Sequence, residues 1–221
     1  SPLAPRSHGY RARRMQPLRI VVIGPGRAGG AVAIAAVRAG HEVVAVVAGP
    51  SGRVPGGLDA PRLPVGSVVP ACDLVVIAVR DDRIAEVASS LRLDGAGAVI
   101  HLSGFTSVGA LDRFVDDDLL VGSVHPLQSL LDPEHGAEAL RGSFAAVTTE
   151  DAGFGLLSSF ARSLGMRPFR LADEDKPAHQ AAAAAASNFV VAALDIASEL
   201  AAATGVPFEG YATLTRSVVD N

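Results

Sequence analysis

The stretch Leu18–Arg53, LRIVVIGPGRAGGAVAIAAVRAGHEVVAVVAGPSGR, places a glycine pattern between two β-branched runs. The run 18–23 predicts a buried strand, 28–39 has the composition of a helix, and 42–47 predicts a second strand. Glycines at 24, 26 and 29 form a G-x-G-x-x-G where the first strand meets the helix. This order of elements within about 30 residues is the context in which the pattern binds a dinucleotide.

Each glycine of this loop has its own expected role. Gly24 permits a tight turn after the strand, Gly26 lets a pyrophosphate approach the backbone, and Gly29 lets the helix pack close to the sheet. Free N–H groups at the helix N-terminus would then face the phosphates. The alternative is a glycine-rich turn without a ligand. The predicted phosphate-binding residues are Gly24, Pro25, Gly26, Arg27, Ala28 and Gly29.

The end of the second strand predicts which dinucleotide is bound. An NAD site usually has an acid there, about 20 residues after the glycines, that accepts hydrogen bonds from the ribose. Here Val47-Ala48-Gly49 stand at that point, and Ser51 and Arg53 follow. A hydroxyl and a guanidinium suit a 2′-phosphate, which favours NADP(H) over NAD. The alternative for Arg53 is an ordinary solvated arginine in a loop rich in glycine and proline.

Strands and helices alternate along the next part of the chain, which predicts an α/β fold with a Rossmann-type, doubly wound, mainly parallel sheet. The stretch 49–70 is expected to be a loop with at most a brief strand at 64–69. The other predicted strands are 73–79, 98–102, 119–124, 144–148 and 166–171, and the other predicted helices of this part are 81–91, 107–115 and 151–164.

The pattern then changes to helices alone. No turn signal interrupts 173–204, Gly205 is a plausible helix end, and 208–219 predicts another helix. We therefore expect a disordered basic leader over 1–16, an NADP-binding domain over 17–172 and an all-helical domain over 173–221. A basic interaction arm is the alternative for the leader. The apolar faces of the helical part need a partner, which predicts a homodimer through these helices.

Composition excludes several classes of function. The chain has 221 residues with a formal charge of −4 and one cysteine, which gives no indication of nucleic-acid binding and leaves no internal disulfide. The six histidines are scattered without metal-binding spacing, so no metal site is predicted. The apolar run 181–186 is interrupted by Ser187, Asn188 and Asp195, so no membrane span is expected and we predict a cytoplasmic protein.

Further segments of the chain support a resemblance to a known family. These are DLVVIAVRDDRIAEVASSL, VIHLSG, GSVHPLQS and DKPAHQAAAAAASNFVVAALDIASELAAATGVPFEG, in that order after the phosphate loop. Together they resemble the Rossmann-like family with a C-terminal DUF2520 domain, in the 6-phosphogluconate dehydrogenase-like superfamily. Its relatives include ketopantoate reductase, pyrroline-5-carboxylate reductase and F420-dependent NADP oxidoreductase. The resemblance implies NADP binding and a helical dimerisation domain that usually continues further than Asn221.

Relatives that reduce keto acids carry a lysine and, four residues later, an amide on the helix at the domain junction. The resemblance assigns these roles to Lys176 and Gln180, although glutamine replaces the asparagine of the relatives. A helix N-terminus disfavours the ammonium form of a lysine in its first turn. A lysine solvated beside Glu174 and Asp175 is the alternative. Either His179 or Gln180 is expected to face the cleft, because adjacent helix positions point about 100° apart.

Polar residues at strand ends complete the predicted site, since ligands of open α/β sheets bind at the carboxyl ends of the strands. His125 can donate to a substrate there, with Gln128 and Ser129 on the same loop, or it can be a structural histidine. His101 is expected to be a structural histidine beneath the site. Ser187 and Asn188 reach either the cleft or a helix interface. The remaining predicted cofactor contacts are Val79, Arg80, Ser103 and Gly104.

Two functions are consistent with these residues. The first is an NADP-dependent oxidoreductase that transfers hydride from NADPH to a small carboxylated carbonyl or imine substrate, for example one similar to ketopantoate. The second is a module that binds NADP(H) as a sensor without turnover, and a structural dimer partner is a third. Hydrolysis by a Ser/His/Asp triad has no support, because the chain contains no G-x-S-x-G motif.

Overall fold

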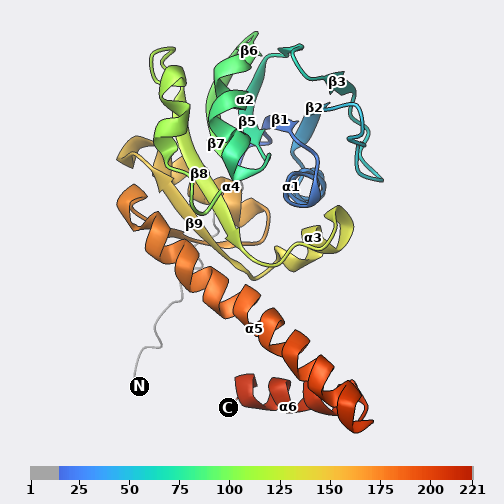
Figure 1. Cartoon of the computed structure of the whole chain (residues 1–221). Coiled ribbons are helices and arrows are strands. Elements are labelled where there is room, and N and C mark those ends of the chain that lie inside the picture. Colours follow the sequence, from blue (N-terminus) through green and yellow to red (C-terminus); the bar gives the residue numbers. More distant parts are fainter. Residues whose placement is uncertain (1–14, 221) are drawn as a thin grey trace, which may run out of the picture.

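An eight-stranded sheet forms the centre of the computed structural model, which describes residues 15–220 (Figure 1). Its strands lie in the order β10-β9-β8-β7-β5-β1-β2-β3. Their bounds are β1 (Arg19–Ile23), β2 (Glu42–Ala48), β3 (Arg62–Pro64), β5 (Cys72–Ile77), β7 (Ala96–His101), β8 (Leu120–Leu127), β9 (Phe144–Thr149) and β10 (Arg167–Arg170). A separate small sheet pairs β4 (Val68–Val69) with β6 (Arg92–Leu93).

Helices cover both faces of the sheet, which confirms the doubly wound α/β architecture. The α-helices of this part are α1 (Arg27–Arg38), α2 (Ile84–Ser90), α3 (Pro133–Ala139) and α4 (Asp151–Ser163). Short 3-10 helices precede α2, as η1 (Asp81–Arg83), and follow β7, as η2 (Val108–Phe114), where the sequence predicted an ordinary helix.

The central strands alternate their side chains between two hydrophobic cores. Ile20 and Val22 of β1 pack with α1 and α4, whereas Val21 and Ile23 pack in the core that contains α2 and η2. A strand buried on both faces reads as a continuous apolar run, which is why these strands were predictable from sequence.

The strands β9 and β10 run antiparallel to the other strands of the sheet. β8 pairs in parallel with β7 but antiparallel with β9, and β10 is parallel to β9. Both runs were predicted as strands from the sequence, but their reversed direction was not. The connection from β8 to β9 contains α3, which packs on α1 and does not cross the sheet. Without a crossover the chain re-enters the sheet in the opposite direction.

The glycine- and proline-rich stretch 49–70 is more ordered than predicted. Its β3 extends the sheet by pairing in parallel with β2, with Val46 opposite Arg62 and Ala48 opposite Pro64. Proline is tolerated in β3 because this is an edge strand, which needs N–H donors on one side only. The edge strand holds the loop that follows β2 against the sheet, next to the predicted cofactor site.

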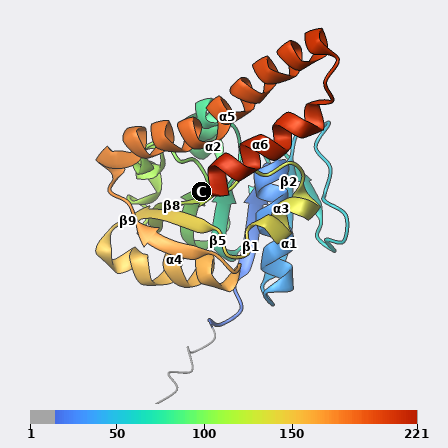
Figure 2. The ribbon, with the colours of Figure 1, turned by 90° about the horizontal axis from the view of Figure 1, so that it is seen from below.

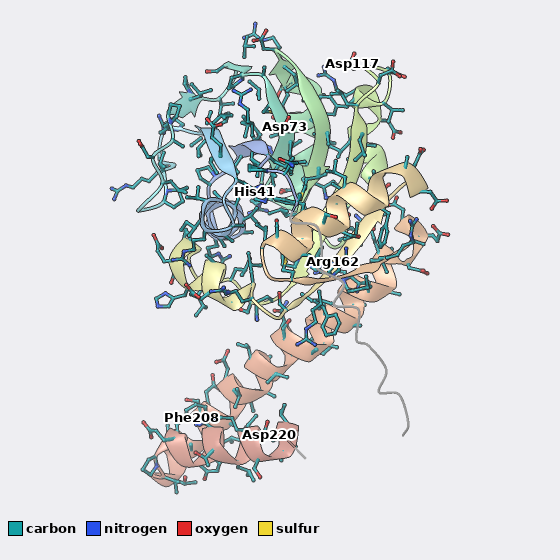
Figure 3. The ribbon with its side chains drawn as sticks, turned by 180° about the vertical axis from the view of Figure 1, so that it is seen from behind. His41, Asp73, Asp117, Arg162, Phe208 and Asp220 are labelled. Carbon is teal, nitrogen blue, oxygen red and sulfur yellow. The ribbon has the colours of Figure 1, made fainter. Side chains whose placement is uncertain are left out.

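His41, just before β2, connects β2 with the start of β1 and the end of α4 (Figure 3). Its Nδ1 accepts a hydrogen bond from Leu18 N at 3.0 Å, and its Nε2 lies 2.8 Å from the hydroxyl of Ser163. Because Ser163 donates its own proton to Phe160 O, His41 Nε2 is the donor to Ser163. The ring therefore holds the start of β1 against the end of α4.

Two helices project from the sheet at the C-terminal end (Figures 1 and 2). A 3-10 turn, η3 (Asp173–Asp175), leads into α5 (Lys176–Thr204), which ends at Gly205 with φ 71° as predicted, and α6 (Phe208–Asp220) turns back beside it. The helix over Asp173–Thr204 is long and apolar enough to cross a membrane by length and composition alone, with an 18-residue window of mean hydropathy 1.5, although no membrane span was expected from the sequence.

The predicted leader, 1–16, lies almost entirely outside the described residues. At its end Met15 is half-buried and packs against the core on the α1 side of the sheet. The first described residues therefore belong to the α/β unit.

Candidate active site between the phosphate loop and the long helix

The loop between β1 and α1 has the geometry of a phosphate-binding loop. Gly24 adopts φ 88°, a conformation that favours glycine, and its N–H donates to Val47 O at 2.9 Å. Gly26 is the N-cap of α1, no side chain caps this helix end, and its first turn contains no acid. A Cβ at Gly26 would meet nothing within 4 Å. The free N–H groups of the first turn therefore face open space that an anion can enter.

A cavity of about 710 Å³ opens over this loop. Of the predicted cofactor residues, Gly24, Pro25, Gly26, Ser51, Arg53 and Val79 line it. The bare glycine backbone, the uncapped helix end and the basic side chain of Arg53 fit a dinucleotide, with its pyrophosphate on the loop.

Two arginines near the end of β2 have different surroundings. Arg62 of β3 donates to the carbonyl oxygens of Gly49 and Gly52, so its guanidinium holds the turn after β2 in place. Arg53 is exposed and makes no hydrogen bond or ion pair within residues 15–220. Arg53 is thus the guanidinium in this cavity that is available to an anionic ligand.

Other predicted cofactor residues lie outside the cavity lining. Gly29 packs against the sheet, because a Cβ there would collide with Gly24 O and lie 2.8 Å from Ala78 Cβ. Its neighbours Arg27 and Ala28 are the first two residues of α1, so their backbone N–H groups lie at the uncapped helix end. Arg80 points into solvent, where its guanidinium pairs with Asp82 at 3.0 Å. The prediction of Arg80 as a cofactor contact is therefore not matched by the position of its side chain.

A second cavity of about 530 Å³ lies between the end of β8 and the first half of α5. It brings together His125, Gln180 and Asn188, which are 63 positions apart at most in the sequence. The other polar side chains in its lining are those of Gln128, Ser129 and Ser187, and the remaining lining residues are Pro126, Leu127, Ala183, Ala184 and Ala186. Of the two residues expected to compete for the cleft, Gln180 lines it and His179 packs behind His125.

The turn after β7 forms part of the wall beside this second cavity. Ser103 is buried and its hydroxyl accepts the N–H groups of Phe105 and Thr106, which shapes the turn. Gly104 lies against the site so closely that a Cβ there would be 2.5 Å from the His125 ring and 2.6 Å from Gln180 Oε1. Gln180 Oε1 is buried and has no hydrogen-bond partner among residues 15–220, so this amide can accept a ligand donor.

Lys176 is buried, contrary to the alternative of a solvated lysine. Its side chain is 1% exposed and its ammonium donates to Thr106 O at 2.6 Å, with Asp173 Oδ1 at 3.8 Å. Burial lowers the pKa of Lys176 to about 8, against the opposing effect of Asp173. Desolvation, not the helix N-terminus invoked from sequence, is the main cause. Lys176 thus holds the turn after β7 to the start of α5.

Asp173 supports the same junction from the other side. Its carboxylate accepts the hydroxyl of Ser107 and, at 3.0 Å, the N–H of Val108. The Asp173 carboxylate therefore binds the first residues of η2 and does not cap α5. This contact and the Lys176 contact fix the helical part onto the sheet.

Burial holds two histidines neutral at pH 7. It lowers the pKa of His125 to about 4, with His179 and Lys176 lowering that pKa further. It lowers the pKa of His101 to about 3, with Lys176 as the next cause. His101 is fully buried, and its Nδ1 accepts Ser103 N at 3.2 Å, so His101 is a structural histidine beneath the turn, as expected.

Sequence reasoning missed α3, which contributes Pro133 and Glu134 to the cofactor cavity. A signal for this helix is present, because Asp132 is followed by proline at the first helical position and Asp132 Oδ1 accepts His135 N at 2.8 Å. The stretch from the end of β8 to the start of α3 lines both cavities, with Leu127, Gln128 and Ser129 in one and Pro133 and Glu134 in the other. One stretch of chain therefore contributes to the walls of both cavities.

Two family models match the chain. The model described as "Rossmann-like domain" covers residues 5–126, and the one described as "Domain of unknown function (DUF2520)" covers residues 143–221. The first spans more than half of the sequence and ends at the strand that carries His125. The second includes β9, β10 and both C-terminal helices. No curated protein matches the sequence.

Solved structures share the fold at low sequence identity. A Bacteroides fragilis protein assigned as an NADP oxidoreductase has a TM-score of 0.77 at 18% identity, over 92% of this chain and 80% of that one. An imine reductase from Pseudomonas sp. has a TM-score of 0.67 at 17% identity, over 93% and 73%. Pyrroline carboxylate reductase from Plasmodium falciparum, with NADP bound, has a TM-score of 0.63 at 15% identity, over 93% and 77%.

Proposed function

Because this chain belongs to the Rossmann-like domain family and continues into a DUF2520 region, we propose that it is an NADP-dependent oxidoreductase that reduces a small carboxylated carbonyl or imine compound. The observation that carries this proposal is the pairing of two cavities. One has a phosphate loop and a free arginine, and the other has a neutral histidine and an unpartnered amide, with one segment lining both.

The cofactor cavity supports NADP(H). The pyrophosphate would lie on the N–H groups after Gly26, and Ser51 and Arg53 would receive a 2′-phosphate at the end of β2. When bound, the nicotinamide supplies a hydride to the substrate. Glu134 is an acid in the same cavity, contributed by α3. Its negative charge opposes phosphate binding, whereas the guanidinium of Arg53 favours it, so Arg53 is the residue to change.

Residues around the second cavity support proton donation and substrate binding. His125 is neutral and can donate a hydrogen bond to the oxygen or nitrogen on which charge develops during reduction. Gln180 and Asn188 supply amide groups for the substrate, including its carboxylate. Lys176 acts here as a positioning residue, since its ammonium is held on Thr106 O.

Arg53→Glu should reverse the preference between the two dinucleotides. We expect wild-type protein to bind NADPH more tightly than NADH in titrations followed by nicotinamide fluorescence. The substitution replaces attraction of a 2′-phosphate by repulsion and should lower the NADPH affinity by about 100-fold, the equivalent of roughly 3 kcal/mol for a lost charge-assisted contact. NADH affinity should change little or rise.

The matched control is Arg162→Glu, which makes the same charge change on the exposed surface of α4 (Figure 3). An unchanged NADPH-to-NADH ratio in Arg53→Glu would rule out the 2′-phosphate role of Arg53. If neither dinucleotide binds to wild-type protein, the oxidoreductase proposal is wrong. Tight NADPH binding without NADPH consumption across a panel of keto acids and cyclic imines would instead support the sensor.

We also propose that the two C-terminal helices form a homodimer. Phe189, Ile196 and Leu200 repeat at helical spacing on α5 and are each at least 60% exposed, and Leu214 and Val218 repeat on α6. An exposed apolar surface of this kind requires a partner. A second copy fits better than a bilayer, because Ser187 and Asn188 in the middle of α5 line a polar cavity with β8.

Leu200→Asp should therefore convert the dimer to a monomer. Leu131→Asp is the control, because Leu131 is even more exposed but lies in the connection before α3. Sedimentation velocity should give twice the chain mass for the wild type and the control, and one chain mass for Leu200→Asp. A monomeric wild type contradicts the dimer, and co-sedimentation of that monomer with lipid vesicles would point to a membrane instead.

A further inference from the structure

Two histidines that lie 54 positions apart in the sequence meet beside the second cavity. His125 Nδ1 is 3.2 Å from His179 Nε2, and the two rings are nearly perpendicular, with centroids 5.4 Å apart. Two ring nitrogens at this distance share one proton, so one of them donates and the other accepts. Phe169 packs edge-on against His179 with centroids 5.9 Å apart, which limits the movement of its ring.

The surroundings of this pair disfavour an extra positive charge on His125. The charged and titratable groups that act on His125 are the His179 ring and the Lys176 ammonium of α5, together with His101 on the neighbouring strand β7. The carboxylate of Asp173 acts in turn on His101, whose pKa it raises. Burial, and to a lesser extent Lys176, also lower the pKa of His179. His125 therefore enters a reaction at pH 7 as a neutral ring. A neutral imidazole that gives up its only N–H proton must receive another one at the same time, or else become an unfavourable anion.

We propose that His125 and His179 form a proton relay that ends at the substrate. As His125 Nε2 gives its proton to the substrate oxygen or nitrogen, His125 Nδ1 receives the proton of His179 Nε2. This relay rests on the proposed reductase function and adds His179 to the residues that serve it. His179 lies behind His125 and is half-buried, so it connects the cavity side of the pair with solvent.

The relay balances protons and electrons. Hydride from NADPH brings two electrons and one hydrogen to the substrate carbon, and the relay brings one proton to the substrate heteroatom. His179 Nδ1 takes a replacement proton from solvent as its Nε2–H bond breaks. Both rings remain neutral and end as the opposite tautomers, which return to the starting ones by proton exchange with water. His125 therefore never has to carry a charge.

The first test reads the rings directly and needs no substrate. In full-length protein with ¹⁵N-labelled histidine, the His125 ring should be a neutral Nε2–H tautomer with Nδ1 as acceptor. His179→Ala should remove this preference and raise the pKa of His125, because His179 lowers it in the wild type. His135→Ala, on an exposed ring paired with Asp132, is the control. If the His125 signals respond to His179→Ala no more than to His135→Ala, the relay is wrong.

The second test measures turnover. His179→Ala should lower kcat by about 100-fold with little change in KM, as for removal of a general acid, and added imidazole should restore part of the loss. A residue with only a structural role would not be rescued in this way. Wild-type turnover together with an unchanged kcat in His179→Ala would overturn the relay alone. NADPH binding without turnover in the wild type would overturn the proposed reaction and the relay with it.

Discussion

Gly29→Ala is expected to destabilise the protein and abolish dinucleotide binding. A methyl group at this position would overlap Gly24 O and lie 2.8 Å from Ala78 Cβ, so α1 must move away from the sheet. Overpacking against backbone should lower the free energy of unfolding by about 3 kcal/mol. The displaced helix end would no longer aim its N–H groups at the pyrophosphate. Chemical denaturation and NADPH titration measure the two effects.

Gly26 and Gly155 serve as controls, because alanine at either position should not lower the stability of the protein. Gly26→Ala meets nothing within 4 Å at φ −71°, so stability should be retained while NADPH affinity falls at least about tenfold, because the methyl group occupies ligand space. Gly155→Ala on α4 also meets nothing and should stabilise by up to about 1 kcal/mol through helix propensity. Unchanged NADPH affinity in both Gly26→Ala and Gly29→Ala would mean that the loop does not bind the cofactor.

His125→Gln should lower kcat by about 100- to 10,000-fold while NADPH affinity stays within about twofold of the wild type. Glutamine keeps a hydrogen-bonding group in the second cavity but cannot relay a proton between two nitrogens. The cofactor cavity is built from other residues, so nucleotide binding should be retained. Single-turnover oxidation of bound NADPH, followed by absorbance, measures the chemical step once a substrate has been found.

Lys176→Met distinguishes the two candidate acids. If Lys176 were the proton donor, this variant would lose as much turnover as His125→Gln at the same temperature and pH. We expect a smaller loss, together with lower stability, because the substitution leaves Thr106 O without its donor. Equal losses in the two variants, with Lys176→Met remaining as stable as the wild type, would contradict the assignment of His125.

The phosphate loop was predictable because its signal is local. The glycine spacing lies within one strand, loop and helix, although Gly24 and Gly29 also pack against Ala78 after β5, and the apolar runs of β1, β2 and β5 reflect burial on both faces. The direction of β9 was not predictable in the same way. It depends on α3 packing against α1 without crossing the sheet, which is a contact between segments about 100 residues apart.

The candidate catalytic residues depended on tertiary structure much more. In the sequence, Lys176 follows three acids and resembles a solvated lysine, yet the start of α5 lies over the turn after β7 and buries its ammonium. From the sequence, His179 was one of two alternative residues expected to face the cleft. Its contact with His125 arises because α5 crosses the end of β8, and no spacing along the chain encodes that crossing.

By itself, the sequence determined the alternation of strands and helices, the phosphate loop and the change to long helices after Asp173. Each of these follows from backbone conformation and from burial over a few neighbouring residues. Only the tertiary structure decided the surroundings of each side chain. It leaves Arg53 free while Arg62 binds backbone carbonyls, and it buries Lys176. It also brings His125 to His179 and places Gln180 beside the same site. Those pairings depend on packing between distant elements, and packing sets the solvation and hydrogen bonding that give each group its chemistry.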